Sequence, residues 1–528
     1  MATTTHPRSA TPGREAGPPP ILASIVATIG PASESPDMVR RLIEGGVAVF
    51  RFNFSHGDFA AHERRLNTVR DVAASLGLSI GCLGDLQGPK IRVGKIPAGV
   101  GEPSPSGGGS VRVDAGQDVV FRRGLDLAFM RAGAHGPEPV LPITYQPLVD
   151  EVEPGHKVLI NDGAIRMLAV DRDPMAGELR CRVTVGGLIT SNKGINLPHS
   201  NLSAPAITER DWECVDWAMK HGLDFLALSF VRTADEVNRL RERVNAAAST
   251  GASPWIQIVS KIEMPQAVQN LESIVDASDA VMVARGDLGV EMDIAQVPVV
   301  QKRIVETCGA FGKPCIVATQ MLETMIENSA PTRAEASDVA NAIFDGADAV
   351  MLSGETATGK HPSLVVETMA RIVACAEEHL CKHRTDHQPP SRLASSHRGI
   401  AALAHGAWEI ARDLDAKVVA CWSEQGGSAR YLSQNRFNIP IIAWSSDAAA
   451  CRRMSLLRGV TAVCAAPPAS GKLSEWNEQV DAYLITRGIC KQGEAIVLVA
   501  GRPLGQAKKT NTIAIHRVGE PTGFTEHK

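Results

Sequence analysis

Charged residues that could handle a phosphate and a divalent ion stand at the ends of short apolar runs. Lys261 precedes Glu263 by two residues in "WIQIVSKIE" (255–263), and Asp287 lies in "AVMVARGDLG" (280–289). Residues two apart on a strand point to the same face, so we expect the ammonium and carboxylate groups to lie side by side. Mg²⁺ is typically held by one or two carboxylates, with substrate oxygens and water completing its shell. The pattern indicates phosphoryl transfer or enolate chemistry, with Lys261 stabilising the developing charge.

Other residues at the ends of such runs could hold the rest of a substrate. Arg51 can bind a phosphate through its planar guanidinium group. The small residues around Gly286 offer backbone N–H groups for a carboxylate at a short helix start, and Thr319 could donate to the same carboxylate. Polar residues also end the remaining runs: Thr28, Asn53, Ser55, Asp85, Ser229, Arg285, Ser353 and Glu355. Because every run ends in a polar residue, we predict that they share one reaction site.

The runs that precede these residues are short and nearly continuously apolar, which is typical of strands buried on both faces. They are 21–30, 47–55, 79–86, 225–231, 255–263, 280–289, 314–321 and 348–356. Helix signals follow most of them; the pairs Thr233–Glu236 and Thr332–Glu335, for example, have the spacing of a capping box. Eight such units predict an α/β protein with a closed (β/α)₈ barrel, whose site lies at the carboxyl ends of the strands.

The third unit is interrupted, which predicts further domains. Its strand ends near Asp85, but the next helical pattern begins only at residue 208, after Gly/Pro/Ser-rich turns and short alternating runs. Such a stretch indicates a small inserted β-barrel domain. A second β-then-α series predicts a C-terminal α/β domain. The expected divisions are a disordered tail (1–20), the barrel (21–88 and 195–372), an inserted lid (89–194) and a C-terminal regulatory and assembly domain (373–528).

Composition excludes several classes of protein. The formal net charge is −4 without a long basic block, which argues against nucleic acid as a partner. No apolar run approaches the roughly 20 residues that a membrane helix needs. The eleven cysteines are scattered without a zinc spacing in a 528-residue chain, which predicts a reducing, cytoplasmic location. Residues 1–20 lack the apolar segment of a secretory signal, and we expect them to be disordered.

Long motifs in the predicted barrel closely resemble the pyruvate kinase family, and the resemblance runs from about residue 21 to the C-terminus. The motifs are "TIGPAS" (28–33), "RFNFSHG" (51–57), "SKIE" (260–263), "MVARGDLGVE" (282–291), "ATQMLETMI" (318–326) and "PTRAEASDVANAIFDGADAVMLSGET" (331–356). The resemblance implies transfer of the phosphoryl group of phosphoenolpyruvate to ADP, giving pyruvate and ATP, the last step of glycolysis.

The resemblance also implies roles for individual residues. Arg51 would contact the phosphate, and Lys261 would steady the group in transfer. Glu263 and Asp287 would hold Mg²⁺ or Mn²⁺. The remaining implied positions are Gly286, Asp287 and Thr319 around the substrate, and Asn53, His56, Arg92 and Lys193 on the nucleotide side.

Lys90 is where the chain departs from many pyruvate kinases. The resemblance implies that K⁺-requiring members hold the ion with residues matching Asn53, Ser55, Asp85 and the Leu86 carbonyl, and that they have a glutamate where this chain has Lys90. A fixed ammonium brings the same charge, and a like charge at ~4 Å costs about 4 kcal/mol at an effective dielectric constant near 20. We therefore predict activity without K⁺, with Lys90 replacing the ion. An exposed loop lysine without a role is the alternative.

Two further segments bear on regulation and on a competing motif. "SEQGGSAR" (423–430) stands where relatives activated by sugar phosphates grip a phosphate; Ser423 and Ser428 suit an anion, whereas Glu424 opposes one. The resemblance implies a homotetramer and allosteric control, with a phosphorylated effector left open.

"GETATGKH" (354–361) nearly matches a P-loop, but His361 replaces the hydroxyl residue that such a loop needs.

Three alternatives stay open at this point. The chain could be another metal-dependent barrel enzyme that forms a pyruvate enolate, such as a lyase or mutase. It could be an inactive relative that binds metabolites, or a kinase with a different phosphoryl acceptor. The inserted and C-terminal domains argue against the first, and the presence of Lys261, Glu263 and Asp287 argues against the second.

Overall fold

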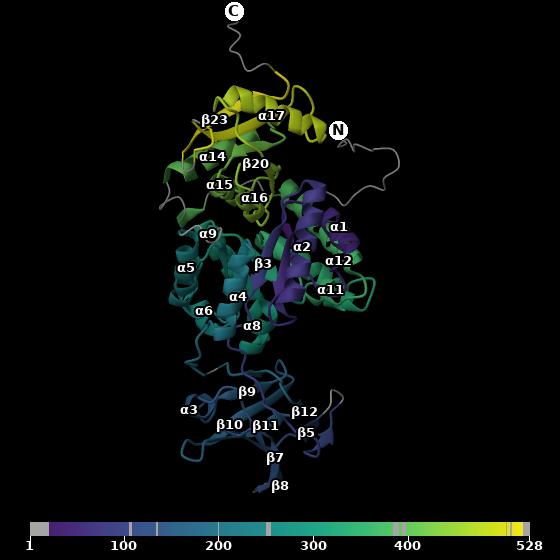
Figure 1. The fold of residues 1–528 in the computed structure, drawn as a ribbon, viewed down its shortest axis with the longest axis vertical. Helices are drawn as coiled ribbons and strands as arrows, with labels where there is room; N and C mark the ends of the chain where they lie inside the picture. Colours follow the sequence, from purple (N-terminus) through teal and green to yellow (C-terminus); the bar gives the residue numbers. More distant parts are fainter. Residues whose placement is uncertain are drawn as a thin grey trace, which may run out of the picture.

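The computed structural model describes residues 21–104, 108–133, 136–198, 200–249, 255–383, 390–392, 398–502, 504–506 and 509–520. The predicted disordered tail, residues 1–20, lies outside the described residues. Three bodies follow one another along the long axis, with the barrel between a β domain and a C-terminal α/β domain (Figure 1). Within the described part of the chain, no helix combines the length and the apolar character needed to cross a membrane.

Eight parallel strands close a barrel in the order β1-β18-β17-β16-β15-β14-β3-β2, which confirms the predicted (β/α)₈ fold. The strands are β1 (Ser24–Thr28), β2 (Val47–Asn53), β3 (Gly81–Asp85), β14 (Phe225–Leu228), β15 (Gln257–Ile262), β16 (Ala280–Ala284), β17 (Cys315–Ala318) and β18 (Ala349–Leu352). Each lies inside a predicted run but is shorter than it. The run 280–289, for example, leaves the sheet after Ala284, the last residue paired with β17, and continues as helix α8 (Arg285–Glu291).

Helices surround the barrel and begin where the sequence supplies capping residues. They are α1 (Pro36–Glu44), α2 (Phe59–Leu76), α4 (Glu209–Lys220), α5 (Ala234–Ser249), α6 (Pro265–Gln269), α7 (Leu271–Ala277), α9 (Val297–Phe311), α10 (Arg333–Asp345), α11 (Gly354–Ala357) and α12 (Pro362–His383). Thr332 and Glu335 form the predicted capping box of α10. At α5, the Thr233 backbone N–H donates to the Glu236 carboxylate over 3.2 Å. Short 3₁₀ turns, η1 (Ile294–Gln296) and η2 (Glu323–Ile326), follow two strand ends.

The chain between β3 and β14 forms a separate β domain with its own buried core. One sheet has the order β13-β9-β10-β11-β6-β8-β7 and the other β12-β5-β4. The elements are β4 (Glu102–Pro103), β5 (Gly109–Val113), β6 (Asp118–Arg122), β7 (Phe129–Gly133), β8 (Gly136–Pro142), α3 (Leu148–Glu151), β9 (Lys157–Ile160), β10 (Ile165–Asp173), β11 (Glu178–Val185), β12 (Gly187–Thr190) and β13 (Ile195–Asn196). The two segments that join it to the barrel pair with each other, because Val93 N–H donates to Lys193 O over 2.8 Å.

The C-terminal domain is a five-stranded sheet in the order β21-β20-β19-β22-β23, in which β23 is antiparallel to β22. Its elements are α14 (Arg398–Asp413), β19 (Val419–Trp422), α15 (Gly427–Gln434), β20 (Ile441–Ser445), α16 (Ala448–Met454), β21 (Val460–Cys464), α17 (Leu473–Thr486), β22 (Ala495–Gly501) and β23 (Thr510–Arg517).

The C-terminal domain closes the amino-terminal end of the barrel. Leu456 is buried in one cluster with barrel-interior residues such as Leu83 and Phe225. Next to it, Arg452 Nε donates to Asp224 Oδ1 over 2.9 Å, and Asp224 Oδ2 accepts the Cys82 N–H. Burial raises the pKa of Asp224 even though Arg452 opposes that change. The opposite, carboxyl-terminal end of the barrel, where the strands carry their polar residues, is not closed by the C-terminal domain.

We expect Arg452→Met to lower the free energy of unfolding by about 3 kcal/mol, because it leaves the Asp224 carboxylate buried without its cation. Since the folded-state pKa of Asp224 lies above its unfolded value, the loss should shrink as the pH falls toward that pKa. Adding Asp224→Asn should recover most of the loss. Chemical denaturation of the unaltered protein, of Arg452→Met and of the double variant measures these free energies of unfolding. Arg243→Met breaks an exposed pair with Asp216 and serves as a control whose stability should change little.

Candidate active site

Lys261 lies at the centre of a buried charge cluster at the carboxyl end of the barrel. Its Nζ atom is 3.4 Å from Asp85 Oδ1 and 3.4 Å from Glu263 Oε2, and it donates to Ser229 Oγ over 2.6 Å. Burial lowers the pKa of Lys261, but the neighbouring carboxylates, first Asp85 and then Glu263 and Asp287, outweigh burial and raise it above its usual value. The ammonium therefore stays protonated at neutral pH.

Asp85 joins this ammonium to the guanidinium of Arg51. Arg51 Nε donates to Asp85 Oδ2 over 2.7 Å, and Arg51 Nη1 donates to Thr28 Oγ1 over 3.0 Å. Burial raises the pKa of Asp85, but Lys261 and Arg51 together hold it below the usual range. Strands β2, β3 and β15 thus fix two cations on opposite oxygens of one carboxylate, an arrangement that can receive a doubly charged phosphate.

Glu263 and Asp287 differ in how their oxygens are satisfied. Glu263 Oε1 accepts the Phe230 N–H over 2.6 Å, whereas Oε2 is buried without a hydrogen bond from any described residue. Burial raises the pKa of Glu263 to about 7, against the opposing effect of Lys261. Asp287 is half-buried and lies in helix α8 rather than on the strand end where the sequence predicted it, because β16 ends at Ala284.

These two carboxylates fit a hard divalent ion. Glu263 Oε2 lies 3.4 Å from Lys261 Nζ but accepts no hydrogen bond from a described residue, so it could also serve as an oxygen ligand, the kind that Mg²⁺ prefers. The described residues contain no group of three or more His, Cys, Asp or Glu side chains that could hold a metal by themselves. A bound ion would therefore need oxygens from the substrate and from water, as Mg²⁺ in phosphoryl-transfer sites does.

Thr319 is held in an unusual backbone conformation beside Gly286. Thr319 and Gln320 have φ angles of 66° and 54°, the left-handed region that L-residues avoid. Thr319 Oγ1 accepts the Gly286 N–H over 2.8 Å and donates to the Ala318 carbonyl over 2.7 Å. Arg285 donates to the Thr319 carbonyl over 2.8 Å and pairs with Asp338. Buried charge thus holds Thr319 next to the start of α8.

Two of the predicted strand-end residues support the site from below. The sequence predicts that Arg285 and Glu355 face the reaction site, and that prediction is wrong. Arg285 is buried under the loop after β17, and Glu355 is buried with its carboxylate accepting the N–H groups of Leu322 and Ser353. Arg285 bonds to backbone carbonyls and to Asp338, and Glu355 accepts backbone N–H groups, so neither is available to a substrate. A single sequence cannot reveal these partners.

The residues predicted for the nucleotide side lie on two different bodies. Asn53 and His56 belong to the loop after β2, where Asn53 Oδ1 accepts the Ser55 N–H over 3.1 Å and His56 is exposed. Arg92 and Lys193 lie on the two segments that join the inserted domain to the barrel, and Arg92 Nη1 donates to the Asn192 carbonyl over 2.9 Å. No hydrogen bond between described residues connects the two groups.

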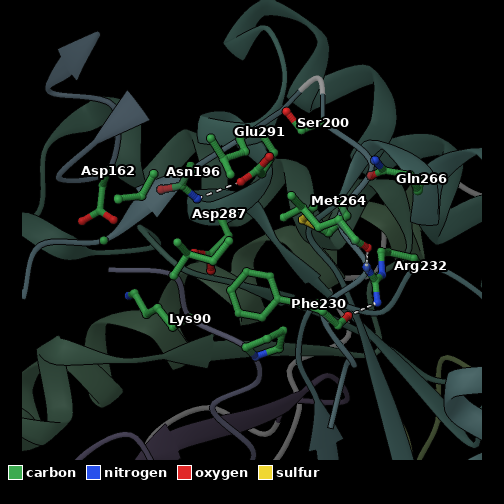
Figure 2. Close-up of a pocket in the computed structure, with 17 residues that line it drawn as sticks. Lys90, Asp162, Asn196, Ser200, Phe230, Arg232, Met264, Gln266, Asp287 and Glu291 are labelled. Carbon is green, nitrogen blue, oxygen red and sulfur yellow. Dashed lines mark hydrogen bonds between the residues drawn. The ribbon is translucent and has the colours of Figure 1, made fainter. Parts of the chain in front are cut away.

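A cavity that is open to solvent lies between the inserted domain and the barrel (Figure 2). Lys90 and Asp287 line it, and Figure 2 shows Phe230 between them and Arg232. Lys90 is exposed, and its ammonium has no hydrogen bond or ion pair with a residue that the structure describes. The structure does not bring it into contact with Asn53, Ser55 or Asp85.

The sequence reasoning missed several residues that line this cavity, above all Glu291. Asn196 Nδ2, on the second joining segment, donates to Glu291 Oε1 over 2.8 Å, while Glu291 Oε2 is buried without a hydrogen bond from a described residue. Burial raises the pKa of Glu291 to about 7. The spacing of four residues from Asp287 on α8 places both carboxylates on one helix face, which is the signal that could have found Glu291.

The two other segments singled out in the sequence lie away from this cluster. In the C-terminal domain, Glu424 accepts the Trp422 indole N–H over 2.9 Å and a hydroxyl from Ser446, so a carboxylate already occupies the loop before α15. Ser423 Oγ accepts the Ala429 N–H over 3.2 Å. The P-loop-like segment forms α11 after β18, and its Lys360 pairs with Glu327 at the surface.

Comparisons with known proteins agree with this geometry. A family model described as the pyruvate kinase barrel domain matches residues 22–366, and one described as the pyruvate kinase alpha/beta domain matches residues 401–516. The pyruvate kinase of Mycobacterium tuberculosis (strain H37Rv) is 39% identical over 498 residues, which cover 94% of this chain and 98% of the relative. That of Corynebacterium glutamicum is 38% identical over 500 residues, with the same coverage.

A solved structure is similar along nearly the whole chain. The crystal structure of a pyruvate kinase from Cryptosporidium parvum aligns with a TM-score of 0.82 and 32% identity, covering 94% of this chain and 96% of that one. The matches span the barrel, the inserted domain and the C-terminal domain together with the charge cluster around Lys261. This chain belongs to the pyruvate kinase family.

Proposed function

We propose that the site transfers the phosphoryl group of phosphoenolpyruvate to ADP with Mg²⁺ or Mn²⁺, and without a requirement for K⁺. The observation that carries the chemistry is the buried ammonium of Lys261, 3.4 Å from both Asp85 and Glu263. Asp85 links it to Arg51, which supplies the second cation. A phosphate that lies between these groups meets two positive charges held in place before it arrives.

Each part of the substrate has a partner of matching chemistry. Arg51 and Lys261 bind the phosphate, and their fixed positions lower the cost of gathering charge in the transition state. The Thr319 hydroxyl and the Gly286 N–H, which bond to the Ala318 carbonyl and to Thr319 Oγ1 in the described structure, would turn to the carboxylate when substrate binds. Glu263 and Asp287 hold the divalent ion, which would neutralise charge on the substrate oxygens. Arg92 and Lys193 face the nucleotide from the lid, and Asn53 and His56 face it from the barrel.

The proposed independence from K⁺ depends on Lys90. Its ammonium lines the cavity together with Asp287, and it has no partner among the described residues that would hold it elsewhere. Lys90 would turn its flexible stem so that its positive charge reaches the shell formed by Asn53, Ser55 and Asp85. A bound K⁺ would then be opposed by a like charge, at about 4 kcal/mol for ~4 Å and an effective dielectric constant near 20.

Assembly and location complete the proposal. We propose the predicted domain divisions with two changes, because β13 (Ile195–Asn196) pairs with β9 of the inserted domain and α12 (Pro362–His383) continues past residue 372. We also propose a homotetramer, which is supported by exposed apolar residues such as Ile294, Val299 and Ile515 on the barrel and on the edge strand β23. All eleven cysteines are free, which supports a cytoplasmic location. A phosphorylated effector would have to displace Glu424 from its hydrogen bonds to bind at the loop before α15.

Lys261→Met should lower kcat about 10³-fold, because the transferring group loses a preorganised cation. Steady-state assays with phosphoenolpyruvate, ADP and Mg²⁺ measure this, and circular dichroism checks that the fold is kept. Lys360→Met is the matched control: Lys360 belongs to the P-loop-like segment and pairs with Glu327 at the surface, so kcat should stay the same. A large loss of kcat in the Lys360→Met control would show that the effect is not specific to Lys261.

Glu263→Gln should raise the Mg²⁺ concentration for half-maximal activity at least about tenfold, because a neutral amide oxygen replaces a metal-binding carboxylate. Direct titration with Mn²⁺, followed by electron paramagnetic resonance, should show the same weakening without any substrate turnover. Unchanged Mn²⁺ affinity would remove Glu263 from the metal site.

Lys90→Glu should make the activity depend on K⁺. In buffer free of sodium and potassium, the rate should fall tenfold or more, and KCl should restore it because the glutamate leaves a place for the ion. The unaltered enzyme should respond to KCl by much less than tenfold. Lys95→Glu, the same charge change at an exposed neighbour, serves as the control. If the unaltered enzyme gains tenfold or more with KCl, Lys90 does not replace the ion.

A further inference from the structure

The loop that carries Lys90 is anchored by a carboxylate from a distant helix. Asp211, at the start of α4, accepts through Oδ1 the N–H groups of Gln87 and Gly88, over 3.0 and 3.2 Å. Its other oxygen, Oδ2, accepts the Thr208 N–H over 2.9 Å and the Thr208 hydroxyl over 2.6 Å. Asp211 is almost completely buried. One carboxylate therefore caps α4 and holds the loop.

The remaining residues of the loop have little freedom to place Lys90 differently. Gly88 has a φ angle of 70°, and a Cβ atom there would lie 2.6 Å from the Phe230 ring. The Lys90 N–H donates to the Gly88 carbonyl over 2.9 Å. Further along, the stem of Lys90 passes Gly194 of the second joining segment, where a Cβ atom would lie 3.4 Å from Lys90 Cε. The backbone, rather than a partner of the ammonium, sets where Lys90 lies.

The anchor needs the side-chain oxygens of Asp211. The side chain accepts four hydrogen bonds, which uses both oxygens of the ionised carboxylate. An asparagine could still turn its oxygen toward the loop and its NH₂ group toward the Thr208 hydroxyl, whereas an alanine offers no acceptor at all. In the alanine variant the two loop N–H groups lack an acceptor, and Gly88 is buried, so the loop would have to move to satisfy them.

We propose that Asp211 is the positioning residue for the cation role of Lys90, acting through the backbone of residues 87–88. This rests on the proposed function, in which Lys90 replaces K⁺. When Asp211 no longer holds the loop, the loop moves and the Lys90 ammonium can no longer reach the shell of Asn53, Ser55 and Asp85. The negative charge of that shell then becomes available to a free ion. Loss of the anchor thus converts an enzyme with a built-in cation into one that needs an added cation.

The test is the K⁺ response of Asp211→Ala, measured by steady-state assay of the full-length protein in sodium- and potassium-free buffer with and without KCl. We expect the rate without K⁺ to fall tenfold or more, and KCl to restore most of it. A helix cap that only stabilises the fold would not create a response to K⁺. Restoration by K⁺ is therefore the readout that separates positioning from a structural role.

Two further variants separate loss of the helix cap from displacement of the loop. Thr208→Ala removes the hydroxyl from the same cap but leaves the bonds from Gln87 and Gly88 to Asp211, so it should lower stability without any response to KCl. Gly88→Ala displaces the loop while leaving Asp211 unchanged, because its Cβ would meet the Phe230 ring, and it should gain the same dependence on K⁺. Thermal unfolding of each variant, followed by circular dichroism, confirms that the assayed protein is folded.

The outcomes separate this inference from the proposal on which it rests. If Asp211→Ala keeps its full rate without K⁺, or loses rate that KCl does not restore, Asp211 does not position Lys90. If Lys90→Glu gains dependence on K⁺ while Asp211→Ala and Gly88→Ala do not, only the positioning role fails. If none of the three variants responds to KCl, the replacement of K⁺ by Lys90 is wrong, and the role of Asp211 is overturned with it.

Discussion

The active site depends on one buried carboxylate, Asp85, which holds Arg51 and Lys261 on its two oxygens. Two cations near each other repel, by about 4 kcal/mol at ~4 Å and an effective dielectric constant near 20. Asp85 offsets that repulsion, and the two cations in turn hold its pKa below the usual range. The three charges therefore stabilise one another before any substrate binds, which is the preorganisation that charge stabilisation in a transition state requires.

The three bodies of the protein each contribute a different constraint on this cluster. The C-terminal domain closes the amino-terminal end of the barrel with Leu456 and the Arg452–Asp224 pair. The inserted domain covers the carboxyl end and is joined by two segments that pair with each other. Those two segments carry Lys90, Arg92 and Lys193, so a movement of the lid would also move three cations that the proposed function places near the substrates.

Charged residues at the strand ends have two different uses in this barrel. Arg51 and Lys261 face the site, whereas Arg285 lies beneath it and holds Thr319 and Gln320 in the left-handed region. Each such residue costs about 1 kcal/mol or more, and the buried guanidinium offsets that cost through bonds to backbone carbonyls. The same residue type at equivalent strand ends therefore serves binding in one case and backbone geometry in the other.

Local sequence alone determined the eight strands and the pairing of Lys261 with Glu263, because strand periodicity and two-residue spacing are properties of neighbouring residues. Tertiary structure decided that Asp85 joins Arg51 to Lys261, that Glu291 lines the cavity, and that Asp211 anchors a loop 124 positions away. Those contacts arise only when distant segments pack together. No spacing in a single chain encodes them, since a buried carboxylate can take any nearby donor that the fold brings to it.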